Sequence, residues 1–251
     1  RNMPKSRYCI ANWKMNLNHT DSKSFLLNWK KKDLYKNNVK SIICPSFSEL
    51  YSTAEIITNC DTELGAQNVY YEQSGAYTGE ISCSMLKSIG CQWVIIGHSE
   101  RRSIFGETDE MVCNKLNALI NEDLNPIVCI GETIEERENE QTQEVLTRQL
   151  SSAFANQKGS KLENVVIAYE PVWAIGTGIT ATVEMVSEAH SNIRNIFSNN
   201  GFNGSEIPIL YGGSVTNDNA GELSTVSDVD GFLVGGASLD VEKFYKIYNQ
   251  L

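Results

Sequence analysis

Basic side chains are scarce relative to acidic ones in this sequence. The 251 residues include 21 lysines and arginines but 31 aspartates and glutamates, so the formal net charge is −10 at pH 7. Nucleic-acid binding needs basic patches that neutralise phosphates, so we expect no nucleic-acid partner. The acidic balance still permits a small anionic substrate, because a few backbone N–H groups and one lysine can bind a phosphate.

Long apolar runs and cofactor motifs are also missing. No run approaches the roughly 18 apolar residues of a membrane span, and the first residues lack the apolar core of a signal peptide. We therefore expect a cytoplasmic protein with no membrane partner. The metal-site patterns H-x-x-x-H, C-x-x-C and D-x-D-x-D are absent, as are the G-x-x-x-x-G-K-S/T and G-x-G-x-x-G loops. We expect chemistry without a metal or a cofactor.

The seven cysteines are odd in number, and several lie within apolar runs, as Cys44 and Cys129 do. This pattern predicts buried, reduced thiols in a reducing compartment. The acidic stretch 132–144 is typical of a solvated helix face.

Short apolar runs, most of them rich in β-branched residues, recur along the chain and are typical of buried parallel strands. They cover residues 8–13, 39–44, 62–66, 93–96, 126–130, 165–169, 207–210 and 231–234. Amphipathic stretches follow most of them, which indicates strand–helix units. Eight such units in this length, with no linker between them, predict a closed (β/α)8 barrel as a single domain over residues 1–251.

Active sites of such barrels lie at the carboxyl ends of the strands, so the polar residues after each run are the candidates. Five runs are followed by such residues, namely Asn12 and Lys14, His98 and Glu100, Glu170, the segment Gly212-Gly213-Ser214, and the pair Gly235-Gly236. Their convergence on one barrel mouth is more informative than any single motif.

Glu170 directly follows the sixth run and precedes an apolar segment that begins with Pro171, Val172 and Trp173. Alone, it could equally be a surface carboxylate. A lid of this composition would exclude water and raise the basicity of the carboxylate, which suits a base that removes a proton from carbon.

His98 follows the fourth run, and Glu107 predicts the start of a helix close behind it. A helix N-terminus disfavours the charged imidazolium, so His98 is expected to act as a neutral hydrogen-bond donor. The other two histidines, His19 and His190, are assigned to the surface. Lys14, in apolar company, either extends to solvent or faces an anion.

The glycine pairs follow the seventh and eighth runs, where barrels commonly bind phosphate. Glycine lets backbone N–H groups approach phosphate oxygens. Two such pairs at these positions favour a phosphorylated substrate.

The motifs at these positions resemble those of the triosephosphate isomerase family. They are Asn-Trp-Lys-Met-Asn at 12–16, Ile-Gly-His-Ser-Glu-Arg-Arg at 96–102, Ala-Tyr-Glu-Pro-Val-Trp-Ala-Ile-Gly-Thr-Gly at 168–178, Tyr-Gly-Gly-Ser-Val at 211–215 and Gly-Phe-Leu-Val-Gly-Gly-Ala-Ser-Leu at 231–239. The resemblance covers nearly the whole chain. It implies a TIM barrel that interconverts dihydroxyacetone phosphate and D-glyceraldehyde 3-phosphate through an enediolate, in glycolysis and gluconeogenesis.

The resemblance also implies a role for each candidate. Glu170 would be the base and His98 the neutral electrophile that polarises the carbonyl. Lys14 would complement substrate charge, Asn12 would donate to the substrate oxygen, and Glu100 would order or relay protons. Backbone groups would hold the phosphate at Gly176, Ser214, Gly235 and Gly236. The mobile lid would consist of Pro171, Val172, Trp173, Ala174, Ile175, Gly176, Thr177 and Gly178.

Family members are usually homodimers, and the segment 67–82 resembles their protruding interface loop, with Tyr77, Thr78, Gly79 and Glu80 at the contact. Thr78 would support the partner's Asn12 and His98. Cys129 matches a family cysteine near the base, with a role in stability. Many members have lysine where this chain has Ile179, and we expect this difference to alter lid kinetics at most.

Two other functions remain open from the residues alone. One is an aldolase-type lyase with a Schiff-base lysine, although Lys14 is the only strand-end lysine. The other is a non-catalytic barrel used as a scaffold, although the four polar residues Asn12, Lys14, His98 and Glu170 speak against it.

Overall fold

The computed structural model describes residues 5–35, 38–159 and 162–251. Within these residues, eight parallel strands close into a barrel in sequence order. They are β1 (Arg7–Asn12), β2 (Val39–Cys44), β3 (Thr62–Ala66), β4 (Trp93–Ile96), β5 (Asn125–Ile130), β6 (Val166–Tyr169), β7 (Ile209–Tyr211) and β8 (Gly231–Val234). The predicted barrel is confirmed, and every strand end lies within two residues of the matching apolar run.

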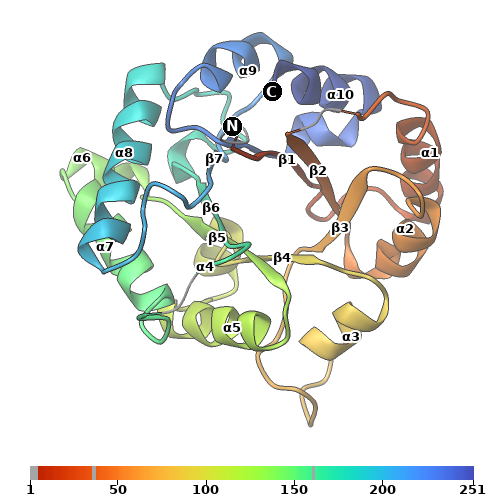
Figure 1. Ribbon diagram of the computed structural model, residues 1–251, viewed down its shortest axis with the longest axis horizontal. Coiled ribbons are helices and arrows are strands. Elements are labelled where there is room, and N and C mark those ends of the chain that lie inside the picture. The colour runs from red at the N-terminus through yellow and green to blue at the C-terminus, as the bar shows by residue number, and fades with distance from the viewer. Residues whose placement is uncertain (1–4, 36–37, 160–161) are drawn as a thin grey trace.

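Helices form a ring around the strands (Figure 1). They are α1 (His19–Trp29), α2 (Leu50–Ile56), α3 (Cys83–Ser88), α4 (Ser99–Ile104), α5 (Asp109–Asn121), α6 (Ile134–Glu138), α7 (Thr142–Ala153), α8 (Val183–Asn199), α9 (Asn217–Ser224) and α10 (Val241–Gln250), with the short 3₁₀ helices η1 (Phe47–Glu49), η2 (Val172–Ala174) and η3 (Gly236–Leu239). Thr108 and Thr182 cap α5 and α8 by accepting hydrogen bonds from backbone N–H groups of the first turn. None of the described helices is long and apolar enough to cross a membrane.

Apolar side chains fill two separate layers. One set lies inside the barrel and includes Ile10, Trp93 and Leu210, while a larger set packs between the strands and the helices. This division follows from the alternation of side chains along each strand, which sends neighbours to opposite faces. Six of the seven cysteines are buried, and Cys60 is partly exposed.

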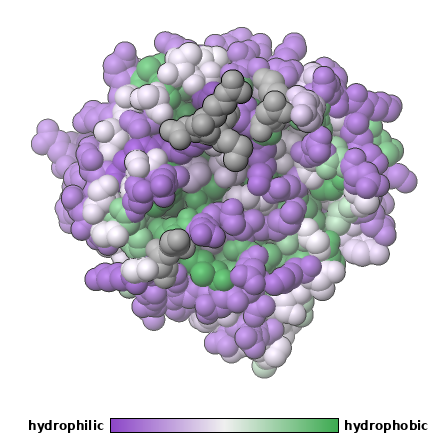
Figure 2. Space-filling view, in the orientation of Figure 1, coloured by the Kyte–Doolittle hydropathy of each residue, from purple (hydrophilic) through white to green (hydrophobic). Residues whose placement is uncertain are grey.

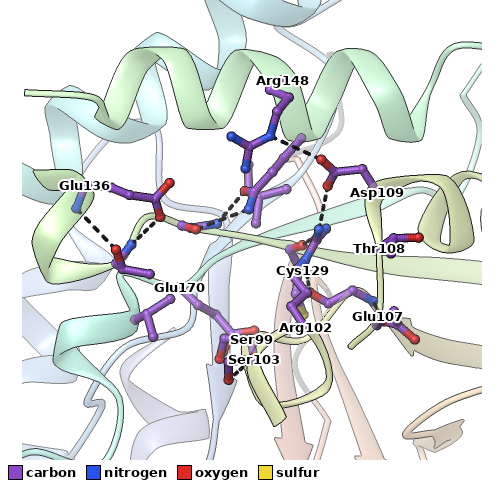
Figure 3. A pocket seen from close by; sticks show the side chains of 16 residues that line it. Ser99, Arg102, Ser103, Glu107, Thr108, Asp109, Cys129, Glu136, Arg148 and Glu170 are labelled. Carbon is purple, nitrogen blue, oxygen red and sulfur yellow. Dashed lines mark hydrogen bonds and ion pairs between the residues drawn. The ribbon is translucent and has the colours of Figure 1, made fainter. Parts of the chain in front are cut away.

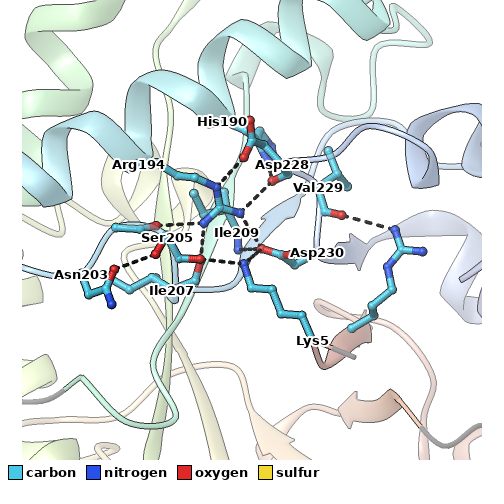
Figure 4. Close-up of polar contacts among 12 residues, drawn as sticks. Lys5, His190, Arg194, Asn203, Ser205, Ile207, Ile209, Asp228, Val229 and Asp230 are labelled. Carbon is cyan, nitrogen blue, oxygen red and sulfur yellow. Dashed lines mark hydrogen bonds and ion pairs between the residues drawn. The ribbon is translucent and has the colours of Figure 1, made fainter. Parts of the chain in front are cut away.

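The amino-terminal end of the barrel is held by ion pairs around Arg194 (Figure 4). Its guanidinium lies 2.7 Å from Asp228 and 2.8 Å from Asp230, and Lys5 reaches Asp230 at 3.0 Å. Asp230 also accepts the backbone N–H of Ile209 at 2.9 Å. These contacts join the start of β7 to the start of β8 at the amino-terminal end of the barrel, opposite the carboxyl ends of the strands. In Figure 2 most of the surface in view is hydrophilic, and hydrophobic residues gather near its middle.

Two surface assignments made from the sequence were wrong. His190 is fully buried on α8, where Nδ1 lies 2.9 Å from the carbonyl oxygen of Asp228. Glu132, at the start of the acidic stretch, is also fully buried, and it accepts hydrogen bonds from Tyr169 and Arg137. Local composition indicates solvent exposure at both places, but each residue has a polar partner from a distant part of the chain, Asp228 for His190 and Tyr169 for Glu132.

Candidate active site

The carboxyl ends of the strands bring the sequence candidates together. Asn12, Lys14, His98, Glu170, Gly176, Ser214, Gly235 and Gly236 all line one cavity of about 240 Å³. Glu100 lies at its edge, because its carboxylate pairs with Lys14 at 2.8 Å. The structure therefore gathers residues that are up to 224 positions apart in the sequence.

Glu170 and His98 face each other in the wall of this cavity. Nε2 of His98 lies 2.9 Å from Oε2 of Glu170, and both residues are buried. Burial alone would raise the pKa of Glu170, but the facing His98 outweighs burial and lowers it. Likewise, burial would lower the pKa of His98, and the carboxylate of Glu170 raises it instead. Each group therefore controls the protonation of the other.

The tautomer of His98 follows from its position at the start of α4. The helix begins at Ser99, directly after the histidine and earlier than Glu107 suggested. His98 is the N-cap residue, and its Nδ1 accepts the backbone N–H of Glu100 at 3.1 Å. An accepting Nδ1 carries no proton, so the neutral ring holds its proton on Nε2 and donates it to Glu170.

Lys14 is directed into the cavity by an uncommon backbone conformation. Its φ of 54° lies in the left-handed region, which costs energy for a residue with a side chain. The side-chain oxygen of Asn12 accepts the N–H of Lys14 at 3.0 Å, and Gln67 donates to its carbonyl oxygen at 2.9 Å. Gln67 is a supporting residue that the sequence reasoning missed, since only the barrel brings the segment after β3 close to the carboxyl ends of β1 and β2.

Glycines line one part of the cavity wall and leave space beside the base. A Cβ at Gly236 would meet no atom within 4 Å, which leaves the backbone accessible from the cavity. A Cβ at Gly212 would fall 2.6 Å from Cγ of Glu170, so glycine is required there to admit the base. Ser214 donates its hydroxyl to the carbonyl oxygen of Ala174 at 2.9 Å and so joins the end of β7 to the lid segment.

The segment 171–178 leaves β6 as η2 and then becomes exposed, with positive φ at Gly176 and Gly178. Its first turn is anchored by the buried Glu132, which binds Arg137 at 2.9 Å and the Tyr169 hydroxyl at 2.8 Å. The Arg137 guanidinium also lies over the ring of Trp173, 5.3 Å from its centre. The lid segment is thus packed at its start and exposed along its second half, where the Thr177 hydroxyl donates to the carbonyl oxygen of Trp173 at 2.9 Å.

A buried lysine behind His98 was not predicted from the sequence. Lys115 on α5 is 2% exposed and binds Asn68 at 2.9 Å and the carboxylate of Glu107. Glu107 in turn accepts the N–H of Gly97 at 2.9 Å, directly before His98. The helical pattern places Lys115 on the apolar face of its helix. A charged side chain on an apolar face indicates a buried partner, and this was the signal available in the sequence.

A second cavity, of about 450 Å³, lies behind the base (Figure 3). Its wall includes Glu170, Cys129, Arg102 and Arg148, and Asp109 binds both arginines, at 2.6 Å and 3.2 Å. Burial raises the pKa of the Cys129 thiol, with a smaller contribution from the charge of Glu170. Cys129 is therefore a neutral thiol packed under the base. Within the described residues, no group of three potential metal ligands is found.

Comparison with known proteins agrees with this geometry. The family model described as triosephosphate isomerase matches residues 7–251. A triosephosphate isomerase of Endomicrobium trichonymphae is 47% identical over 238 residues, which are 94% of this chain and 95% of the relative. Proteins of the same name from Alkaliphilus oremlandii and Aquifex aeolicus are 47% and 43% identical, over 95% and 96% of this chain and 97% and 98% of their own lengths. A barrel of this topology, matched by the family model over almost its whole length, belongs to the triosephosphate isomerase family.

Proposed function

We propose that this protein interconverts dihydroxyacetone phosphate and D-glyceraldehyde 3-phosphate in glycolysis and gluconeogenesis, without a cofactor. The observation that carries the proposal is the buried carboxylate of Glu170, 2.9 Å from His98 in a cavity with one lysine and a glycine-lined wall. The names of the relatives support the same reaction.

Glu170 would remove the proton from the substrate carbon and return it to the neighbouring carbon. Its Oε1 is buried and makes no hydrogen bond of normal geometry to the described residues, so it is available for that proton. His98 would transfer its Nε2 hydrogen bond from Glu170 to the substrate oxygen as the enediolate forms. The hydrogen bond between the two residues keeps both in place until substrate enters.

The remaining groups would bind charge and exclude water. Lys14 would face the phosphate and the developing enediolate, with Asn12 donating to the same oxygen. Glu100 holds the Lys14 ammonium and, through its backbone N–H, the His98 ring, so it would order the proton-carrying groups. Backbone groups of Gly176, Ser214, Gly235 and Gly236 would bind the phosphate, and the lid 171–178 would close over it.

An aldolase-type lyase is less well supported by the site. The cavity lysine, Lys14, is bound to the carboxylate of Glu100 at 2.8 Å, whereas a Schiff-base lysine must be free to attack a carbonyl carbon. Borohydride added with substrate should leave the protein without a covalent adduct. A trapped adduct on Lys14 would support the lyase instead.

The first experiment measures isomerisation of glyceraldehyde 3-phosphate by the wild type and by Glu170→Asp. Shortening the base by one methylene should lower kcat about 100-fold or more, which corresponds to about 3 kcal/mol of barrier. The matched control is Glu63→Asp. Glu63 lies near the amino end of β3, away from the cavity at the carboxyl ends of the strands, so we expect this variant to keep wild-type activity.

Circular dichroism should show both variants folded. Equal activity of Glu170→Asp and wild type would contradict the assignment of the base. A folded wild type that does not isomerise the substrate would favour the hypothesis of a non-catalytic scaffold.

We also propose a homodimer that works in the cytoplasm. Residues 72–80, between β3 and α3, are all exposed, and this segment projects beyond the ring of helices (Figure 1). Exposed apolar side chains follow the carboxyl ends of the four consecutive strands β1–β4, namely Met15, Phe47, Tyr77, Ile104 and Phe105. One apolar sector beside a projecting loop is suited to a second copy, with Tyr77, Thr78, Gly79 and Glu80 at the contact and Thr78 near the partner's site.

A further inference from the structure

The peptide that carries the base lies directly against Gly131, the first residue after β5. A Cβ added to Gly131 would fall 1.7 Å from the carbonyl oxygen of Glu170 and 2.6 Å from its carbonyl carbon. No side chain fits between the two backbones. A displacement of Gly131 must therefore displace the peptide of Glu170, because packed atoms transmit such shifts.

One side chain holds Gly131 from the other side. Oε1 of Gln149 accepts the N–H of Gly131 at 2.9 Å, and Nε2 of Gln149 donates to its carbonyl oxygen at 3.3 Å. Gln149 belongs to α7 and is only 5% exposed. Both backbone groups of Gly131 thus find their partners in one amide, and losing it would leave both groups without a protein partner at a partly buried position.

On this side the base is bordered by the Cys129 thiol and by a cavity. The cavity of about 450 Å³ lies behind it, and Gln149, Gly131 and Glu170 are all part of its wall. The position of Glu170 depends instead on the backbone of 130–132, because its N–H donates to Ile130 at 2.8 Å and that of Val172 donates to Glu132 at 3.0 Å. Gly131 lies between Ile130 and Glu132, the two residues that accept these hydrogen bonds.

We propose that Gln149 is a positioning residue for the base: it clamps Gly131 and thereby sets the distance from the Glu170 carboxylate to the reacting carbon. The inference rests on the isomerase function proposed above. Gln149 itself does not line the substrate cavity, so its loss should impair proton transfer and leave substrate binding nearly intact.

The experiment compares Gln149→Met with Gln157→Met. Methionine keeps the length of the side chain and removes both hydrogen bonds. Gln157 is a matched control, because it is 7% exposed and its amide donates to Asn117 at 2.8 Å, away from the base. We measure kcat and KM, and the kinetic isotope effect on kcat with substrate deuterated at the carbon that loses its proton.

We expect Gln149→Met to lower kcat at least tenfold, to change KM less than threefold, and to raise the isotope effect above that of the wild type. Gln157→Met should keep wild-type values of all three. The isotope effect and KM do not depend on the amount of folded protein, so they remain informative if Gln149→Met folds poorly.

A purely structural role would lower activity in proportion to the folded fraction and leave the isotope effect unchanged. That result, or a loss of kcat equal to that of Gln157→Met, would overturn the inference. A wild type with no isomerase activity would instead overturn the proposed function.

Discussion

At the scale of single residues, the buried His190 is the clearest case of a titrating group kept from its usual charge. It has no exposed surface, and its Nε2 has no hydrogen-bond partner among the described residues. Burial lowers its pKa to about 4, the Asp228 carbonyl opposes this, and the Arg194 guanidinium lowers it further. The folded protein therefore holds a neutral imidazole where the unfolded chain would bind a proton.

This difference predicts how stability depends on pH. Between the unfolded pKa of roughly 6.5 and the folded pKa of about 4, the unfolded state binds more protons, so stability falls as pH falls through this window. From pH 7 to pH 5 His190 should contribute a loss of about 2 kcal/mol. Below the folded pKa both states are protonated and the loss saturates.

The test is urea unfolding of wild type and His190→Asn at pH 7 and pH 5. Asparagine keeps an N–H that can donate to the carbonyl oxygen of Asp228 and does not titrate. The variant should lose less stability than wild type over this interval. Equal losses would show that His190 does not carry this part of the pH dependence.

At the scale of elements, the lid segment combines an anchored start with an end that is exposed to solvent. Glu132 and Arg137 hold the turn at Trp173, whereas Ile179, directly after the segment, is 56% exposed. The oxygen of Thr177 accepts the N–H of Ile179 at 3.2 Å, so the local turn at the exposed end rests on backbone and hydroxyl groups. The side chain of residue 179 has little to contact in this state.

Ile179→Lys should therefore change lid motion and not the chemistry. We expect kcat to change less than tenfold, which is below about 1.4 kcal/mol of barrier. Steady-state kinetics with the glyceraldehyde substrate, with solvent viscosity varied to detect a step limited by motion, would measure this. A larger change in kcat would place residue 179 in the catalytic machinery and contradict this view.

At the scale of the whole molecule, the exposed apolar sector after β1–β4 predicts self-association. Met15 is 95% exposed, so a charge there should spare the folded subunit. Met15→Glu should weaken the dimer at least 100-fold, because the charge would be buried against the partner's apolar surface.

Analytical ultracentrifugation of wild type, Met15→Glu and Tyr35→Glu would measure the association. Tyr35 is 76% exposed and precedes the amino end of β2, so it tests the same change at the opposite end of the barrel. Wild type and Tyr35→Glu should sediment as dimers and Met15→Glu as a monomer. A monomeric wild type, or a dimer that tolerates Met15→Glu, would contradict the proposed interface.

The sequence alone was enough to predict the barrel and the candidates at its mouth. Buried parallel strands need apolar runs, and catalytic groups of a barrel follow those runs, so Asn12, His98 and Glu170 could be found by position. Both signals are local, because they depend on a few neighbouring residues.

Only the tertiary structure decided which polar residues are buried and what they hold. His190, Glu132 and Lys115 lie in stretches whose composition is that of exposed or amphipathic helices, and their partners Asp228, Tyr169 and Asn68 are far away in sequence. The contact of Gln149 with Gly131 is of the same kind. Long-range hydrogen bonds leave no periodic trace in a single sequence, because either partner alone looks like an ordinary polar residue.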